Sequence, residues 1–225
     1  MAEIFRNLDW SVLTGMLLSI IPALISITLH ELSHGLVAYR LGDNTAKNMG
    51  RLTLNPLKHV DIFGLIMMAV FHFGWAKPVP VNMGNFKNPK RGMALTAIAG
   101  PLSNVIICIV FLALYGFFYP ILARTNAGEY VLEILYLTSW ISLGLAVFNI
   151  IPIPPLDGSK VLFSCISDEM YYKLMRYERY GMIILIILVS TKILGTPLSN
   201  VTEFLYGKLF FIAEGANKLG LILFA

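Results

Sequence analysis

Two histidines and a glutamate lie close together in the motif His-Glu-Leu-Ser-His, which occupies residues 30–34. Side chains four residues apart share one face of a helix, so His30 and His34 can offer two imidazole nitrogens to one metal ion. Glu31 lies at the flank of that face, where its carboxylate can take a proton from a water molecule. The spacing therefore predicts a hydrolytic zinc site, with His30 and His34 as ligands and Glu31 as the general base.

Two histidines leave a tetrahedral zinc site short of a third protein ligand. Asp157 is the strongest candidate, because it follows a run of three prolines that ends an apolar segment and precedes Gly158, which permits a sharp turn. An ordinary alternative is that Asp157 caps a helix that starts at Ser159. The other candidates are His59, Asp61 and His72. We expect His59 to belong to a loop cap with Asp61, and His72 to an interface.

The composition places the chain in a lipid bilayer. Its 225 residues are 57% hydrophobic and only 13% charged, which is more apolar than a soluble globular domain tolerates. Ionisable groups inside an apolar helix are expensive, so the motif at 30–34 marks a function there. The net charge of +4 is spread over loops without an aromatic and basic stripe, which argues against nucleic acid as a partner.

The apolar segments predict an all-α polytopic membrane protein with four to six helices and a short β or re-entrant loop region between the first two long spans. We expect one domain over 1–225, with a catalytic core at about 20–165. The tail is expected to be an amphipathic surface helix or a final span. The expected elements are a helix at 8–41, a strand at 51–54, a re-entrant segment at 62–73, an extended loop at 74–82, spans at 92–123 and 130–151, a helical segment at 161–180, a short apolar segment at 181–194 and the tail at 197–225.

The basic residues predict the orientation in the membrane. The stretches 40–91 and 160–179 hold eight and four Lys or Arg residues, together 12 of the 17 in the chain, and both stretches fall on the same side. Basic loops face the cytoplasm, so we expect a multi-pass protein of the cell membrane with the site towards the cytoplasmic side. The same count brings Asp157 to the depth of residues 30–34.

Several further motifs accompany the first one, and together they resemble the site-2 protease family of intramembrane metalloproteases. The resemblance covers residues 20–165 and implies one zinc ion bound by His30, His34 and Asp157, with Glu31 as catalytic base. It also implies that Asn104 and Asn149 lie near the site. The motifs are His-Glu-Leu-Ser-His-Gly at 30–35, Asn-Pro-Leu-Lys-His-Val-Asp at 55–61, Gly-Trp-Ala-Lys-Pro-Val-Pro-Val-Asn at 74–82, Gly-Pro-Leu-Ser-Asn at 100–104 and the segment 149–158.

Two points about this resemblance stay open. Asn104 could donate its amide to an oxyanion or to the substrate backbone, or it could form a hydrogen bond between helices. Ile62 occupies a position where many relatives have proline, and the chain is expected to lack the PDZ module or the nucleotide-sensing domain that relatives often carry.

The expected function is intramembrane proteolysis, the hydrolysis of peptide bonds in or near the transmembrane segments of membrane-protein substrates in the lipid bilayer. A regulatory partner is left open. The extended segments 51–54 and 77–82 are expected to pair with the substrate as an added strand. The alternatives are another membrane zinc hydrolase, such as a prenyl-protein processing enzyme, and a non-proteolytic zinc-binding scaffold or regulator. Segment 149–158 argues against the first, and an intact Glu31 argues against the second, because a scaffold needs ligands but no base.

Overall fold

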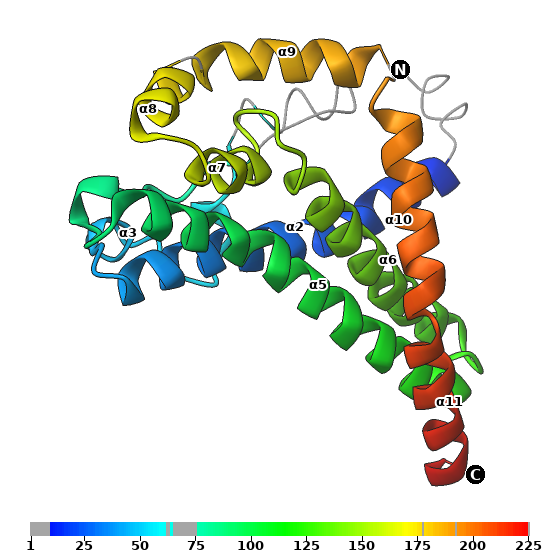
Figure 1. Cartoon of the computed structure of the whole chain (residues 1–225). Coiled ribbons are helices and arrows are strands. Elements are labelled where there is room, and N and C mark those ends of the chain that lie inside the picture. Colours follow the sequence, from blue (N-terminus) through cyan, green and yellow to red (C-terminus); the bar gives the residue numbers. More distant parts are fainter. Residues whose placement is uncertain (1–9, 62–63, 65–75, 177, 192, 225) are drawn as a thin grey trace, which may run out of the picture.

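The structure is a computed structural model that describes the whole chain except residues 1–9, 62–63, 65–75, 177, 192 and 225 (Figure 1). Its described elements are helices, and no β-strand occurs among the described residues, which confirms the expected all-α class. The long helices are α2 (Trp10–Arg40), α5 (Pro89–Leu122) and α6 (Asn126–Asn149). The shorter ones are α3 (Thr45–Asn48), α7 (Asp157–Ser164), α8 (Asp168–Arg176), α9 (Glu178–Ser190), α10 (Gly195–Leu209) and α11 (Phe211–Leu223), with single 3-10 turns at Pro56–Lys58 and Met83–Asn85.

Three of the described helices are long and apolar enough to cross a membrane: Leu18–Arg40 within α2, and the whole of α5 and α6. A fourth crossing is obtained if Tyr180–Ser190 and Gly195–Leu223 form one span, which is bent by 80° at the break between them. This bent pair combines most of α9 with α10 and α11. The structure thus confirms a polytopic helical membrane protein, and its described residues give three spans, or four with the bent pair, against the four to six expected.

The core lies where α5, α6 and the C-terminal helices meet. Helix α6 returns alongside α5, α2 crosses both of them, and α10 and α11 lie along α6 and α5 respectively (Figure 1). The buried cluster at this junction contains Cys108, Leu112, Leu143, Tyr206 and Ala213. Helices α7, α8 and α9 lie together at one end of the bundle (Figure 1). The amphipathic tail of the prediction is thus two helices, of which α11 packs on α5.

The polar region after α2 differs from the prediction. Residues 51–54 form no strand, with bends at 52–54, and strand pairing among the described residues of this region is limited to one antiparallel bridge between Val60 and Ala76. Two of the backbone groups that a ladder would use have other partners: the His59 imidazole contacts the Thr53 carbonyl at 2.9 Å, and the Arg51 N–H donates to the Ala46 carbonyl at 2.9 Å. The expected re-entrant segment 62–73 lies outside the described residues, apart from Gly64.

The expected helical segment at 161–180 is divided into α7 and α8, and α9 begins separately at Glu178. The break lies between Ser164 and Asp168. There the Ser167 hydroxyl and carbonyl oxygens accept hydrogen bonds from the backbone N–H groups of Met170 and Tyr171 at the start of α8. Ser167 thus caps this helix. Polar capping at this position explains why the hydrophobic pattern did not continue as one helix.

Candidate metal centre

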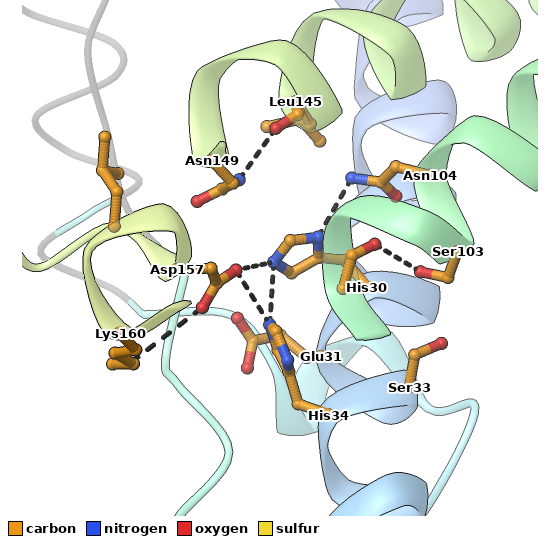
Figure 2. A network of polar contacts seen from close by, with 12 residues as sticks. His30, Glu31, Ser33, His34, Ser103, Asn104, Leu145, Asn149, Asp157 and Lys160 are labelled. Atoms are coloured by element: carbon orange, nitrogen blue, oxygen red, sulfur yellow. Dashed lines mark hydrogen bonds and ion pairs between the residues drawn. The ribbon is translucent and has the colours of Figure 1, made fainter. Parts of the chain in front are cut away.

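His30 and His34 lie one turn apart on α2. Their Nε2 atoms face each other at a distance of 3.0 Å (Figure 2). Both side chains are buried, with 7% and 8% of each residue exposed. The helix continues past Pro22 to Arg40, so the motif sits on an unbroken stretch. The predicted placement of both imidazoles on one helix face is what the four-residue spacing requires.

Asp157 reaches this pair from the first residue of α7. Its Oδ2 atom lies 3.2 Å from Nε2 of His30 and 3.1 Å from Nε2 of His34 (Figure 2). The residue is 7% exposed. The residue that caps α7 is Leu156, and no side-chain cap bond is present, so the structure does not support the alternative that Asp157 caps the helix.

Gly158 serves this placement by close packing. A Cβ atom added to Gly158 would lie 2.1 Å from the carbonyl oxygen of Ile150 and 2.7 Å from that of Ile151. Gly158 does not have a positive φ angle; the glycines of the described chain that do are Gly42 and Gly50. Gly158 therefore lets α7 fold back against the end of α6, rather than supplying the sharp turn that the sequence suggested.

The three side chains present a set of electron pairs that suits a metal ion. Their Nε2 and Oδ2 atoms lie 3.0–3.2 Å apart, and ligand atoms about 2.0–2.1 Å from a tetrahedral zinc lie about 3.3–3.4 Å apart. Asp157 Oδ2 is buried without a well-formed hydrogen bond. A single proton would remove the repulsion between electron pairs in only one of the three contacts, whereas one cation at the centre would remove it in all three. The donor set therefore fits zinc.

The ring of His34 is fixed by helix α5. Its Nδ1 atom lies 2.7 Å from the carbonyl oxygen of Thr96, which can only accept a hydrogen bond, so Nδ1 carries the proton. In the neutral ring, Nε2 then holds the free electron pair and faces the centre of the site. Gly100 makes this close approach possible, because a Cβ there would lie 2.4 Å from His34 Nε2 and 2.6 Å from His30 Cε1.

Glu31 is half-buried beside the two histidines, and its partner comes from the loop. Its Oε2 atom accepts a hydrogen bond of 2.8 Å from the backbone N–H of Val79. The other carboxylate oxygen is left for another proton donor. Arg51, itself buried, donates to the carbonyl oxygens of Lys77 at 2.7 Å and Pro78 at 3.3 Å. The arginine thus fixes the loop that holds the candidate base.

Asp43 anchors the same region on its other side. Its carboxylate accepts hydrogen bonds from the backbone N–H groups of Thr45 and Asn82 and from the side chains of Thr45 and Asn85. Burial alone would raise the pKa of Asp43, but these hydrogen bonds outweigh burial and hold that pKa below its usual range. Asp43 therefore stays charged and ties α3 to the residues after the loop.

Asp157 has a second charged neighbour in Lys160, whose Nζ lies 4.0 Å from Asp157 Oδ1 (Figure 2). Burial alone would raise the pKa of Asp157, but the imidazoles of His30 and His34 outweigh it and hold that pKa below its usual range. The carboxylate is thus available as an anion, with one oxygen at the histidines and the other towards Lys160.

The two asparagines implied by the resemblance both lie near the centre (Figure 2). The Asn104 amide lies 3.1 Å from His30 Nδ1. The Asn149 amide donates a hydrogen bond of 3.0 Å to the carbonyl oxygen of Leu145 in its own helix. The expected partnership of His59 with Asp61 is absent: the His59 ring contacts Thr53, and Asp61 accepts from Gly64. His72 lies outside the described residues.

Sequence reasoning gave no role at the site to four of its neighbours: Thr96, Gly100, Val79 and Lys160. Thr96 and Val79 act through backbone atoms, which carry no side-chain signal. Gly100 had a detectable signal, because a glycine followed by proline inside an apolar span is unusual and marks close packing. Lys160 lies three residues after Asp157, so it could have been found once Asp157 was placed at the start of a helix.

Comparisons with known proteins point to one protein family. The model of peptidase family M50 matches residues 120–191, which contain Asp157. The YwhC protein of Bacillus subtilis is 41% identical over 76% of this chain and 80% of its own length, and the Rip2 protein of Mycolicibacterium smegmatis is 30% identical over 86% and 74%. Both are described as candidate zinc metalloproteases.

A third relative, zinc metalloprotease MJ0392 of Methanocaldococcus jannaschii, is 33% identical over 74% of this chain and 38% of its own length. No solved structure matches the chain. The likeness to YwhC over most of both chains, together with the match of the family model, shows that the chain belongs to peptidase family M50, the site-2 protease family.

Proposed function

We propose that this protein is an intramembrane zinc metalloendopeptidase that hydrolyses peptide bonds in or near the transmembrane segments of other membrane proteins. The observation that carries the proposal is the convergence of His30, His34 and Asp157 within 3.0–3.2 Å of one another, with Glu31 beside them. Among the described residues these three form the group that could hold a metal ion. One zinc ion per chain is the stoichiometry that three ligands predict.

Each residue has a distinct task in this proposal. His30, His34 and Asp157 hold the metal, which when bound supplies a Lewis acid that polarises a peptide carbonyl and acidifies water. Glu31 takes a proton from the attacking water and delivers it to the leaving amine nitrogen. Its Val79 contact fixes one carboxylate oxygen for this work. The burial of the ligands limits bulk water at the site, which strengthens every charge interaction there.

The structure narrows where a substrate could pair. The N–H groups of Lys77 and Val79 already donate to the His59 carbonyl and to Glu31, and the carbonyls of Lys77 and Pro78 accept from Arg51. Prolines supply no N–H. Of the segment 77–82 that was expected to pair with the substrate, residues 77 and 78 and the N–H group of Val79 are therefore unavailable in this conformation, and the N–H group of Asn82 donates to Asp43. An added strand would need the backbone between the Val79 carbonyl and Val81, or a movement of the loop.

The location in the cell is also part of the proposal. The basic stretch 40–91 begins at the end of α2, and the stretch 160–179 begins within α7. The contact between His34 on α2 and Asp157 on α7 brings the starts of both stretches to the metal centre. By the positive-inside rule this side faces the cytoplasm. We therefore place the active site towards the cytoplasmic side of the cell membrane.

The test is a zinc measurement combined with cleavage of a single-span substrate by the purified protein and its Glu31→Gln variant. We expect the variant to bind zinc like the wild type and to lose cleavage, because an amide cannot accept the proton from water. Glu133→Gln is the matched control, since Glu133 is exposed on α6 and far along the chain from the site. Cleavage that survives in Glu31→Gln would refute the mechanism.

The same measurement separates the proposal from a non-proteolytic zinc-binding scaffold. A scaffold needs the three ligands but has no use for the base, so it would bind zinc and cleave nothing with either Glu or Gln at position 31. A wild-type protein that contains zinc and cleaves no single-span substrate would favour the scaffold. A wild-type protein without zinc would exclude both functions.

A further inference from the structure

Asn104 lies in the buried middle of α5 and contacts a proposed metal ligand. It is fully buried, and one atom of its side-chain amide lies 3.1 Å from His30 Nδ1 (Figure 2). The other amide atom has no hydrogen-bond partner in the described part of the chain. This single polar contact is directed at the ring nitrogen that faces away from the centre.

The proton on His30 decides which amide atom makes the contact. If the Asn104 NH2 group donates to Nδ1, a neutral ring carries its proton on Nε2, and Nε2 then cannot bind a metal. If instead the amide is turned by half a rotation, its oxygen accepts from Nδ1–H and Nε2 is free. The oxygen and nitrogen of an amide occupy nearly the same volume, so the hydrogen-bond network has to assign them.

Helix α5 also contacts Nδ1 of the second histidine, His34. The carbonyl oxygen of Thr96 accepts from Nδ1 of His34 at 2.7 Å. Thr96, Gly100 and Asn104 follow one another at four-residue intervals, which places them along one face of α5. Gly100 between them leaves the space in which the two rings lie. One face of α5 therefore presents an acceptor, a gap and a second polar group to the two imidazoles.

We propose that Asn104 is a positioning residue whose side-chain oxygen accepts a hydrogen bond from His30 Nδ1–H and so presents Nε2 of His30 to the metal. The proposal rests on the proposed zinc site, and it gives Asn104 a task other than that of an oxyanion donor. Partners of this kind orient the ring, fix its tautomer and raise the basicity of the ligating nitrogen.

The test measures zinc affinity of the full-length purified protein in detergent, by competition with a chromogenic chelator, and the visible absorption of the cobalt-substituted protein. Asn104→Leu removes the acceptor, and we expect zinc to bind about 10–100-fold more weakly. Asn104→Asp keeps an acceptor of similar shape, so we expect affinity and a tetrahedral cobalt spectrum close to those of the wild type. If Asn104 were an oxyanion donor, both variants would bind zinc like the wild type. If its NH2 group donated to His30, both variants would lose that hydrogen bond.

Ser142→Ala is the matched control for a lost hydrogen bond between helices. The Ser142 hydroxyl on α6 is buried and contacts Ser26 on α2 at 2.7 Å, one turn before His30. We expect this variant to bind zinc like the wild type. Wild-type affinity in Asn104→Leu, an equal loss in Asn104→Asp, or an equal loss in Ser142→Ala would each overturn the positioning role. A wild-type protein that binds no zinc would instead overturn the proposed function, and the positioning role with it.

Discussion

Two of the metal ligands, His30 and His34, and the candidate base Glu31 occupy neighbouring positions on α2, yet different kinds of structure hold them. His30 and His34 face helix α5, which contacts both Nδ1 atoms, and Asp157 completes the group from α7. Glu31 is held by one N–H group of the extended loop, at Val79. A metal site needs its ligands fixed within about 0.5 Å, whereas a base must exchange partners during a reaction. The rigid side of the site, formed by α2, α5 and α7 around the three ligands, thus serves metal binding. The loop side, formed by Glu31 and the loop at Val79, serves proton transfer.

Breaking the rigid side at a ligand is expected to give the largest effect. Asp157→Asn replaces an anion with a neutral amide, so we expect a loss of zinc affinity greater than the about 10–100-fold typical of partners outside the ligand set. Competition with a chelator measures it. Asp168→Asn is the control, because Asp168 is an exposed carboxylate that pairs with Lys90. Zinc affinity of Asp157→Asn equal to that of the control would remove Asp157 from the ligand set.

A smaller change on the same side is Gly100→Ala. The added methyl would overlap ring atoms of His34 and His30 at 2.4–2.6 Å, so α5 must move away from α2. We expect about 1–3 kcal/mol lower stability, as for overpacked cores, and weaker zinc binding. Thermal unfolding and chelator competition measure the two effects. Gly144→Ala is the matched control, since nothing lies within 4 Å of its added methyl. Equal behaviour of the two variants would show that the close approach of α5 is not required.

The smallest effect is expected from the loop side. Arg51→Leu removes the donor that fixes the Lys77 and Pro78 carbonyls, so Glu31 is held less well. We expect cleavage to slow by about 10-fold, because small displacements of a reacting group reduce its effective concentration, while zinc affinity stays unchanged. Arg51→Lys, which keeps the charge, should recover part of the rate. A loss of zinc in Arg51→Leu would contradict the division between a rigid side and a loop side.

The prediction from sequence was most accurate where the pattern itself is local. The spans at 92–123 and 130–151 were expected within about four residues of α5 and α6, because long apolar runs leave few alternatives in a membrane. The strand at 51–54 was wrong, since the Thr53 carbonyl contacts the His59 imidazole and the Arg51 N–H donates to Ala46, rather than to a neighbouring strand. The division at 165–167 was also missed, because a single capping serine outweighs a hydrophobic pattern.

What the sequence alone determined is the pair of imidazoles with Glu31 beside them, because a helix with 3.6 residues per turn places side chains four residues apart on one face whatever surrounds it. What only the tertiary structure decided is which groups face that pair. Asp157 lies more than 120 residues away along the chain, and the contacts of Thr96, Asn104 and Val79 depend on how α5 and the loop pack against α2. Packing between distant segments has no local pattern, so the ligand set was completed only by the fold.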